Sequence, residues 1–274
     1  MLLSRIVPDR ARGRTGRPGD TGGDVERVYV IGDIHGRRDL FAQIVSLITR
    51  DHAARGPVRA RLVLLGDLID RGPDSATLVE WCKTLTETSG RFVVLKGNHE
   101  AMMVDALSGD IETLEFWLEQ GGRETLRSWG VSPSTLAGGA GSRLIREARR
   151  CVGASTLSWM DGLPLMDRHE GHVFVHAGVR PGVALEQQGE DDLLWIRGPF
   201  LDSDEDHGAI VVHGHTVHEG GPDVRQNRIG IDTGAFRTGM LTAIGIEDGE
   251  TWFVSTGATP RVERRERREL ATAW

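Results

Sequence analysis

The feature that most constrains the fold is a pattern that occurs three times within the first hundred residues. The runs 27-RVYVIGD-33, 61-RLVLLGD-67 and 91-RFVVLKG-97 are largely apolar, and each reaches a glycine at or beside its polar end. Such runs predict strands that are covered on both faces of their sheet. Apolar residues at helical spacing follow each run, and strands that alternate with helices predict an α/β layered core.

The other residues complete one predicted domain, over residues 25–258, with a tail on each side. Five further apolar runs predict strands, at 172–178, 209–215, 228–234, 240–246 and 251–255. The segment from about 111 to 163 shows only helical patterns and predicts a helical insertion over one edge of the core. Residues 1–24, rich in Arg and Gly, predict a disordered tail. Residues 259–274 are predicted to be a charged C-terminal tail, in which the run 261–270 favours a short solvated helix or a frayed end.

Composition excludes several classes of protein. A chain of 274 residues, 39% of them hydrophobic, can bury a core without disulfides. The formal charge of −7 and the isoelectric point near 5.8 give no electrostatic basis for binding nucleic acid or an anionic membrane. The two cysteines, Cys82 and Cys151, predict neither a disulfide framework nor a thiolate metal site. No apolar run reaches the length of a membrane span, so we expect a cytoplasmic protein.

Polar residues gather where the predicted strands end. They are Asp33, His35, Asp67, Asp70, Arg71, Asn98, His99, Glu100, His176, His213, His215 and Asp232. In an open α/β sheet the carboxyl ends of the strands line one crevice where ligands bind, so we expect these side chains to converge. Each residue alone could cap a helix or form a turn. Because capping does not require histidine, the combination favours a functional site.

The mixture of donor atoms favours a metal centre. Carboxylate, imidazole and amide oxygen together suit Mn²⁺, Fe or Zn²⁺, and do not suit Ca²⁺ or Cu(I). Asp33 and His35 are two residues apart at the end of one strand and can point to the same side of it. Two ions held about 3.5 to 4 Å apart need a bridging carboxylate, which Asp67 is placed to supply. We expect two divalent ions, with Mn²⁺ preferred.

Three short motifs carry a family resemblance. They are Gly32-Asp33-Ile34-His35-Gly36, Gly66-Asp67-Leu68-Ile69-Asp70-Arg71-Gly72 and Gly97-Asn98-His99-Glu100. They resemble the signature motifs of the metallophosphoesterases, in the form used by the PPP family of Ser/Thr protein phosphatases. Trp195 with Arg197, the triplet at 214–216 and residues 231–235 are similar to the bacterial and bacteriophage lambda branch. The resemblance spans about residues 27–254 and implies the calcineurin-like fold, a layered β-sandwich of mixed sheets flanked by helices.

The resemblance also implies which residues hold the metals. The first ion would be held by Asp33, His35 and Asp67, and the second by Asp67, Asn98, His176 and His215. His213 has the same strand parity as His215 and could be a ligand instead. The resemblance places His215 on the metal and leaves His213 at most in an outer position.

The remaining residues of the motifs are implied to act on the substrate. His99 would be the general acid, oriented by a hydrogen bond to Asp70, and Arg71 and Arg197, together with Asn98, would contact the substrate phosphate. A metal-bridging hydroxide would attack phosphorus directly. The implied substrate is a phosphoprotein, through phosphoserine or phosphothreonine, or a small phosphoester.

Two other functions stay open at this stage. Hydrolases of diadenosine tetraphosphate use a very similar scaffold with the same first and third motifs, whereas the complete Asp70-Arg71-Gly72 favours a protein phosphatase. A catalytically silent binding module would predict losses among the metal ligands, and the sequence shows none.

Overall fold

The computed structural model describes residues 26–257 and 263–264, so the predicted N-terminal tail lies outside the described residues. The strands form two sheets. The five-stranded sheet has the order β10-β9-β1-β2-β3 and consists of β1 (Glu26–Ile31), β2 (Arg59–Leu64), β3 (Phe92–Val94), β9 (Thr242–Glu247) and β10 (Glu250–Ser255). The six-stranded sheet has the order β11-β7-β8-β6-β5-β4 and consists of β4 (Met166–His169), β5 (His172–Val175), β6 (Ile210–His213), β7 (Asp223–Val224), β8 (Arg228–Gly230) and β11 (Glu263–Arg264).

Both sheets are mixed. Strands β1, β2 and β3 pair in parallel, and β9 and β10 add to β1 as an antiparallel hairpin. In the other sheet β5, β6 and β8 pair in parallel, while β4 and β7 are antiparallel to their neighbours. The parallel strands therefore end at one side of each sheet, which brings the segments that follow them together.

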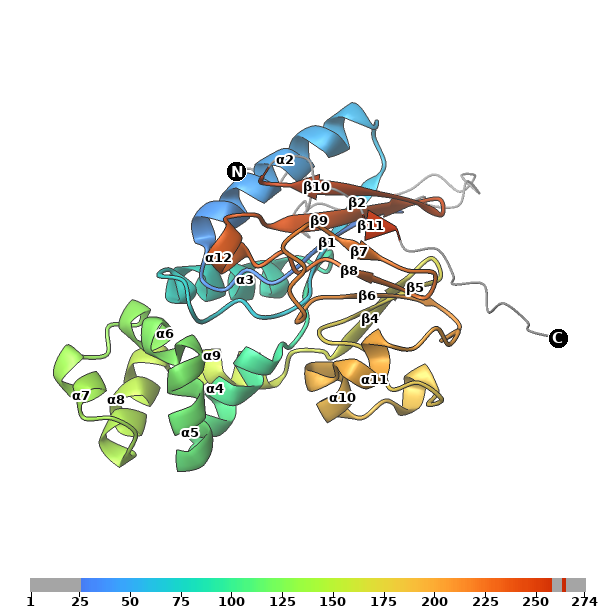
Figure 1. Ribbon diagram of the computed structural model, residues 1–274. Coiled ribbons are helices and arrows are strands. Elements are labelled where there is room, and N and C mark those ends of the chain that lie inside the picture. The colour runs from blue at the N-terminus through green and yellow to red at the C-terminus, as the bar shows by residue number, and fades with distance from the viewer. Residues whose placement is uncertain (1–25, 258–262, 265–274) are drawn as a thin grey trace, which may run out of the picture.

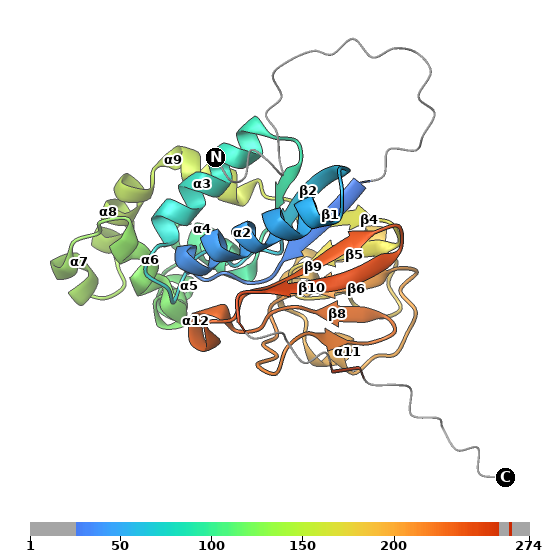
Figure 2. The same ribbon diagram turned by 90° about the horizontal axis from the view of Figure 1, so that it is seen from above.

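The two sheets pack face to face, with helices on both outer faces (Figures 1 and 2). Side chains alternate along each strand, because successive residues point to opposite faces. Val28 and Val30 of β1 meet Phe174 and Val212 of the second sheet, whereas Tyr29 and Ile31 face the helices. This arrangement confirms the predicted layered sandwich of mixed sheets flanked by helices.

Helices cover the outer face of each sheet. The first sheet is covered by α2 (Arg38–Ala54) and α3 (Ser75–Thr88), and α4 (Asn98–Ser108) follows β3. The outer face of the second sheet packs against α10 (Glu190–Trp195) and α11 (Gly198–Leu201), which follow the short turn η2 (Leu185–Gln187). The short α12 (Ala235–Thr238) precedes β9.

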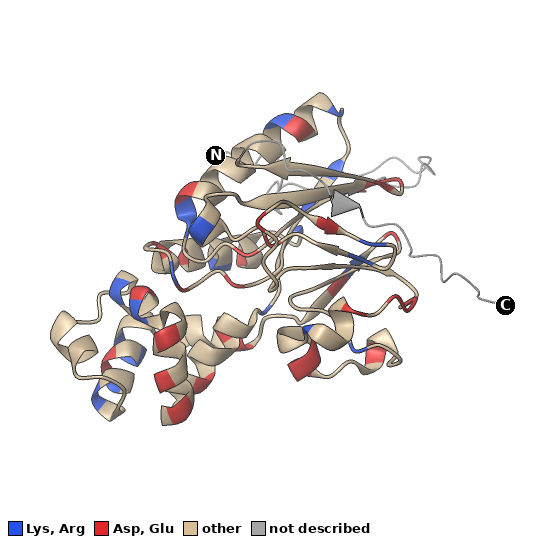
Figure 3. Cartoon of the chain, in the orientation of Figure 1, with Lys and Arg blue, Asp and Glu red and all other residues tan. Residues whose placement is uncertain are grey.

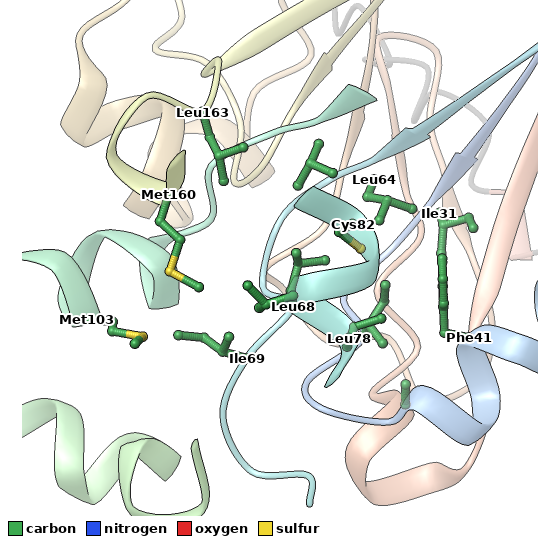
Figure 4. Packing of buried hydrophobic residues seen from close by; sticks show 14 of the residues in the cluster. Ile31, Phe41, Leu64, Leu68, Ile69, Leu78, Cys82, Met103, Met160 and Leu163 are labelled. Carbon is green, nitrogen blue, oxygen red and sulfur yellow. The ribbon is translucent and has the colours of Figure 1, made fainter. Parts of the chain in front are cut away.

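Between α4 and β4 the chain folds as helices alone. These are α5 (Ile111–Trp117), the π-helical turn η1 (Leu118–Gly122), α6 (Arg123–Ser128), α7 (Pro133–Ala137), α8 (Ser142–Val152) and α9 (Ala154–Asp161). They lie beside α4 at one end of the sandwich (Figure 1). In Figure 4 Met160 of α9 and Met103 of α4 pack beside Ile69, a residue of the segment after β2. The insertion is thus joined to the core at a strand exit.

Some details differ from the sequence-based expectations. The first three predicted strands extend to residues 33, 67 and 97, but the observed ones end at Ile31, Leu64 and Val94. Strands β4 and β7 lack apolar runs, which is why periodicity did not predict them. The expected helix or frayed end over 261–270 is wrong at Glu263–Arg264, where backbone pairing with β7 makes a strand. In the described part of the chain no helix is long and apolar enough to cross a membrane.

Candidate functional site

The polar residues at the strand exits lie close together, and they come from both sheets. The segments after β1, β2 and β3 carry Asp33, His35, Asp67, Asp70, Asn98 and His99, and those after β5 and β6 carry His176 and His215. Backbone hydrogen bonds tie neighbouring exits, as between His35 N and Asp67 O at 2.8 Å and between Gly214 N and His176 O at 2.8 Å. His176 Nδ1 donates to Leu65 O at 2.9 Å, which joins the second sheet to the first.

The backbone of the site is strained. Seven non-glycine residues of the described chain have positive φ, and five of them are His35, Asp67, Asp70, Arg71 and His215, with φ between 48° and 75°. The other two each precede a glycine in the β4–β5 and β9–β10 hairpins, where positive φ is common. Side chains in this conformation persist only where surrounding contacts hold them, and such residues cluster at functional sites. At these five residues the chain therefore leaves the extended conformation that a strand requires.

Glu100, to which sequence reasoning gave no role, holds the segments after β2 and β3 in place. Its buried carboxylate accepts hydrogen bonds from Asp67 N at 2.8 Å, Leu68 N at 2.9 Å and Gly97 N at 3.0 Å. A Cβ at Gly97 would collide with the backbone nitrogen and a carboxylate oxygen of Asp67. The Gly-Asn-His-Glu motif therefore positions the segment after β2 as well as its own side chains.

His35 and His176 point unprotonated nitrogens into the site. The Nδ1 atoms donate to Ile69 O at 2.8 Å and to Leu65 O at 2.9 Å, which assigns the tautomer. Burial lowers the pKa of both imidazoles, so both are neutral near pH 7. Their Nε2 atoms can then only accept. His176 Nε2 nevertheless lies 2.8 Å from Asn98 Oδ1, which also only accepts, so two lone pairs meet where a cation would fit.

Asp67 lies between two groups of possible metal ligands. One group is His35, Asp67 and His99, and the other is Asp67, His176 and His215, with the ligand atoms of each group within 4.8 Å of one another. Asn98 Oδ1 joins the second group, 3.0 Å from His215 Nδ1. Asp33 belongs to neither group, although its Oδ2 accepts from His215 N at 2.9 Å. The first group therefore contains His99, which the resemblance placed on the substrate, and lacks Asp33, which the resemblance placed on the first ion.

The residues present fit a pair of divalent cations. Burial and the nearby carboxylates of Asp232 and Asp67 raise the pKa of Asp33 well above its usual value. Asp33 Oδ1 and His215 Nε2 are buried and have no hydrogen-bond partner among the described residues. Crowded carboxylates and lone pairs of this kind are what a bound cation relieves. The donors are oxygen and imidazole nitrogen, a set that several divalent metals accept.

His99 and Asp70 form a tight buried pair. His99 Nδ1 lies 2.5 Å from Asp70 Oδ2. Burial opposes protonation of His99, yet Asp67 and the hydrogen bond to Asp70 outweigh it and raise the pKa of His99. Two residues of the insertion fix the carboxylate, because Trp117 Nε1 donates to its Oδ2 at 2.8 Å and Thr125 Oγ1 to its Oδ1 at 2.6 Å. Asp70 therefore cannot rotate away from the imidazole.

Arg71 and Arg197 line a cavity of about 180 Å³ above this pair. The cavity is also lined by His35, Asp67, Asn98, His99, Met102, Phe116, Gln120, Trp195 and His215. The Arg71 guanidinium lies 2.6 Å from His35 Nε2 and 3.2 Å from His99 Nε2, and it stacks on Phe236 of α12. Arg197 is exposed and donates to Thr216 Oγ1 at 3.4 Å. Two guanidinium groups thus share one small cavity with the imidazole and carboxylate cluster.

The sequence of the chain matches one known protein family. The family described as Calcineurin-like phosphoesterase matches residues 26–236 of the chain. The chain is a calcineurin-like phosphoesterase. A curated relative, Serine/threonine-protein phosphatase 1 of Salmonella typhimurium, is 32% identical over 228 residues, which cover 80% of this chain and 92% of the relative.

Two other similar proteins are named for a different activity. The symmetrical Bis(5'-nucleosyl)-tetraphosphatase of Nitrosospira multiformis is 25% identical over 276 residues, covering 84% of this phosphoesterase and 96% of the relative. The crystal structure of a candidate diadenosine tetraphosphatase superposes with a TM-score of 0.57 at 21% identity, covering 87% of this chain and 96% of that one. The solved structure supports the fold alone, and the Salmonella and Nitrosospira relatives carry the names of two different phosphoesterase activities.

His213, whose role the sequence left open, does not line the cavity of the phosphoesterase. Its ring packs edge-on against Phe200 at 5.1 Å, on the outer side of the second sheet. Burial and the nearby Arg228 lower its pKa to about 3, so it stays neutral. The chain turns after β6, and His215, with a φ of 61°, points to the cavity instead.

Sequence reasoning assigned no role to four residues that contact the site of the phosphoesterase. Trp117, Thr125 and Glu100 bind the motif residues, and Phe236 lies against Arg71 and His35. Glu100 carried a signal, since it stands inside a recognised motif. Trp117 stands in the segment Phe116-Trp117-Leu118, followed by Gly121-Gly122, which resembles the bacteriophage lambda branch, but no role was assigned to it. Neither Thr125 nor Phe236 stands in any pattern that marks a site.

Proposed function

We propose that this phosphoesterase hydrolyses phosphomonoesters, and specifically phosphoserine and phosphothreonine in proteins. The size of the cavity carries this proposal. About 180 Å³ is less than the roughly 300–1,000 Å³ of sites for drug-sized ligands, so it encloses a phosphoryl group and little more. The complete Asp70-Arg71-Gly72 motif and the Salmonella relative support the same substrate.

Arg71 and Arg197 would bind the phosphoryl oxygens. A guanidinium can donate two parallel hydrogen bonds to a phosphate, and two such groups in one cavity would neutralise its charge. Phe236 stacks on Arg71 at 4.4 Å and restricts its side chain to the cavity. Asp33, His35, Asp67, Asn98, His176 and His215 would hold the two divalent ions. When bound, these ions supply an activated water and stabilise charge on the phosphoryl group.

His99 would donate a proton to the leaving oxygen. Burial opposes protonation of His99, but Asp67 and the hydrogen bond to Asp70 outweigh it and raise the pKa of His99, which favours the doubly protonated imidazole. Asp70 accepts the Nδ1 proton at 2.5 Å, which leaves the Nε2 proton facing the cavity that His99 lines. Proton donation by a positioned side chain matters most when the leaving group is strongly basic, as the alkoxide of serine is.

The alternative is a hydrolase of dinucleoside polyphosphates. It is favoured by the Nitrosospira relative, which matches over almost its whole length. Metal-loaded protein should be tested in parallel on phosphopeptides, on diadenosine tetraphosphate and on a generic aryl phosphate. We expect the highest kcat/KM on a phosphopeptide. A higher kcat/KM on diadenosine tetraphosphate would replace our proposal with the alternative.

A further inference from the structure

Two exposed aromatic side chains stand at the mouth of the cavity. Phe116 of α5 is 48% exposed and Trp195 of α10 is 39% exposed, and both line the cavity. Large apolar side chains this exposed are few in the described chain, where the others are Trp81 and Ile111. Aromatic faces at an open site offer stacking or cation–π contacts to whatever enters.

The same two segments carry acidic residues without basic ones. Residues 110–122, which include α5, contain Asp110, Glu112, Glu115 and Glu119 and no Lys or Arg. Residues 188–195, which include α10, contain Glu190, Asp191 and Asp192 and again no Lys or Arg. Figure 3 shows the acidic bands on both helices. On α5 Glu112 and Phe116 are four residues apart and lie on one helix face, and Glu119 of η1 adjoins Gln120, which lines the cavity.

Several of these carboxylates are free of polar partners in the described part of the protein. Among the described residues, no ion pair or side-chain hydrogen bond involves Glu112, Glu115, Glu119 or Asp191. By contrast, Glu190 pairs with Lys96 at 3.3 Å and Asp192 with Arg180 at 2.5 Å, while Asp110 caps α5. On α12, next to the Phe236 that stacks on Arg71, Arg237 is already paired with Glu219 at 2.6 Å. The mouth therefore has unpaired negative charge. The cavity behind it has the guanidinium groups of Arg71 and Arg197, which would bind a phosphate.

We propose that this mouth selects phosphorylated peptide segments with Lys or Arg next to the phosphoresidue; the inference rests on the phosphomonoesterase function proposed above. A basic side chain beside the bound phosphoresidue would meet the carboxylates of α5 and the faces of Phe116 and Trp195. The same carboxylates would repel the further phosphates of a dinucleoside polyphosphate or the acidic flanks of a peptide, since like charges at short range oppose binding. The mouth thus favours a cationic substrate.

The test uses three phosphopeptides of equal length with one central phosphoserine and flanks that are basic, neutral or acidic. For the Mn²⁺-loaded full-length protein we expect kcat/KM to rank basic, neutral, acidic. The basic-to-acidic ratio should be about 10 or more at low salt and should shrink as salt is added, because screening weakens interactions between exposed charges. Equal kcat/KM for all three peptides would overturn the inference about the mouth.

A pair of variants separates the mouth from the overall charge of the molecule. Glu112→Gln with Glu119→Gln removes two charges beside the cavity, and we expect the basic-to-acidic ratio to fall by about 3- to 10-fold. The control is Glu87→Gln with Glu250→Gln, which removes two exposed charges at the end of α3 and the start of β10, away from the cavity. The control should keep the wild-type ratio, and a similar fall in both variants would overturn the inference.

The outcome also distinguishes this inference from the proposed function. A protein that hydrolyses nitrophenyl phosphate or diadenosine tetraphosphate but none of the phosphopeptides would contradict the proposed function itself. A protein that hydrolyses all three phosphopeptides equally would keep the proposed function and lose only the selectivity of the mouth. Both double variants should retain wild-type kcat/KM on nitrophenyl phosphate, because neither removes a residue that contacts the phosphoryl group.

Discussion

His99 and Asn98 are neighbours in the chain but have different surroundings. Asn98 Oδ1 faces His176 Nε2 and His215 Nδ1, whereas His99 is hydrogen-bonded to Asp70. This difference follows from the start of α4 at Asn98, because consecutive residues on a helix project about 100° apart. At the scale of single residues, the two side chains should therefore serve metal binding and proton transfer separately.

Replacing His99 with Asn should lower kcat and leave the metal content unchanged. On phosphoserine peptides we expect a loss of about 10² to 10⁴, the usual contribution of general acid catalysis. Nitrophenyl phosphate leaves as a weakly basic phenoxide and should lose much less. Kinetics on both substrates, with metal content measured by elemental analysis, check this. Equal losses on both, with chemistry rate-limiting, would leave His99 as a positioning residue only.

Asp67→Asn should be the most damaging change among the expected metal ligands. Asp67 is shared by both ligand groups, so its replacement should weaken both ions together. We expect metal affinity to fall by more than about 100-fold, since loss of even an outer partner costs about 10- to 100-fold. Calorimetric titration with Mn²⁺ measures this directly. Two ions bound at wild-type affinity would rule out the bridging role.

At the scale of elements, the helical insertion takes part in the site. Gly121 in η1, with φ of 112°, accepts a hydrogen bond from Arg71 N, and a Cβ there would collide with the Arg71 backbone. Trp117 of α5 and Thr125 of α6 hold both oxygens of Asp70. Phe116 of the same insertion lines the cavity. The insertion therefore sets the position of the second motif as well as the shape of the entrance.

Trp117→Phe should lower kcat without loss of metal. The change removes the indole N–H from the buried Asp70 carboxylate and keeps an aromatic ring in the core, so Asp70 should hold His99 less firmly. We expect a loss of stability of about 1–3 kcal/mol, the cost of an unsatisfied buried group. The matched control is Trp159→Phe, which removes a similar bond, from Nε1 to Thr86 Oγ1, elsewhere in the insertion. If both variants lost kcat equally, the effect of Trp117 would be one of stability alone.

At the scale of the whole molecule, two sheets and an insertion meet at one site. His176 and His215 come from the second sheet and Asp67 from the first, and the bond from His176 Nδ1 to Leu65 O holds the two sheets in register at this point. Bound cations would therefore connect both halves of the sandwich. A ligand that binds only the folded state also stabilises it by mass action.

Removal of metal should abolish activity and lower the melting temperature. We expect an excess of chelator to inactivate the protein and Mn²⁺ to restore the activity best, because the site offers carboxylate, amide oxygen and imidazole but no thiolate. A thermal melt with and without Mn²⁺ provides a readout that does not depend on substrate. Full activity in excess chelator would contradict the two-metal site.

The sequence alone determined the features that depend on local pattern. Apolar runs followed by helical spacing predicted the strands and helices of the first sheet, since burial imposes a period on neighbouring residues. The polar residues that follow these runs were predicted to converge, and the structure places them together around Asp67. The motifs were readable because each is a short contiguous segment with a distinctive mixture of side chains.

Only the tertiary structure decided which distant residues complete the site. Trp117 and Thr125 are 47 and 55 residues from Asp70, and no periodicity marks a contact over that separation. His213 and His215 have the same parity in sequence, yet positive φ at His215 turns one imidazole to the cavity and leaves the other against Phe200. The pairing of Glu263–Arg264 with β7 depends on an open sheet edge. Local patterns determine which elements form, whereas packing between elements determines which side chains meet.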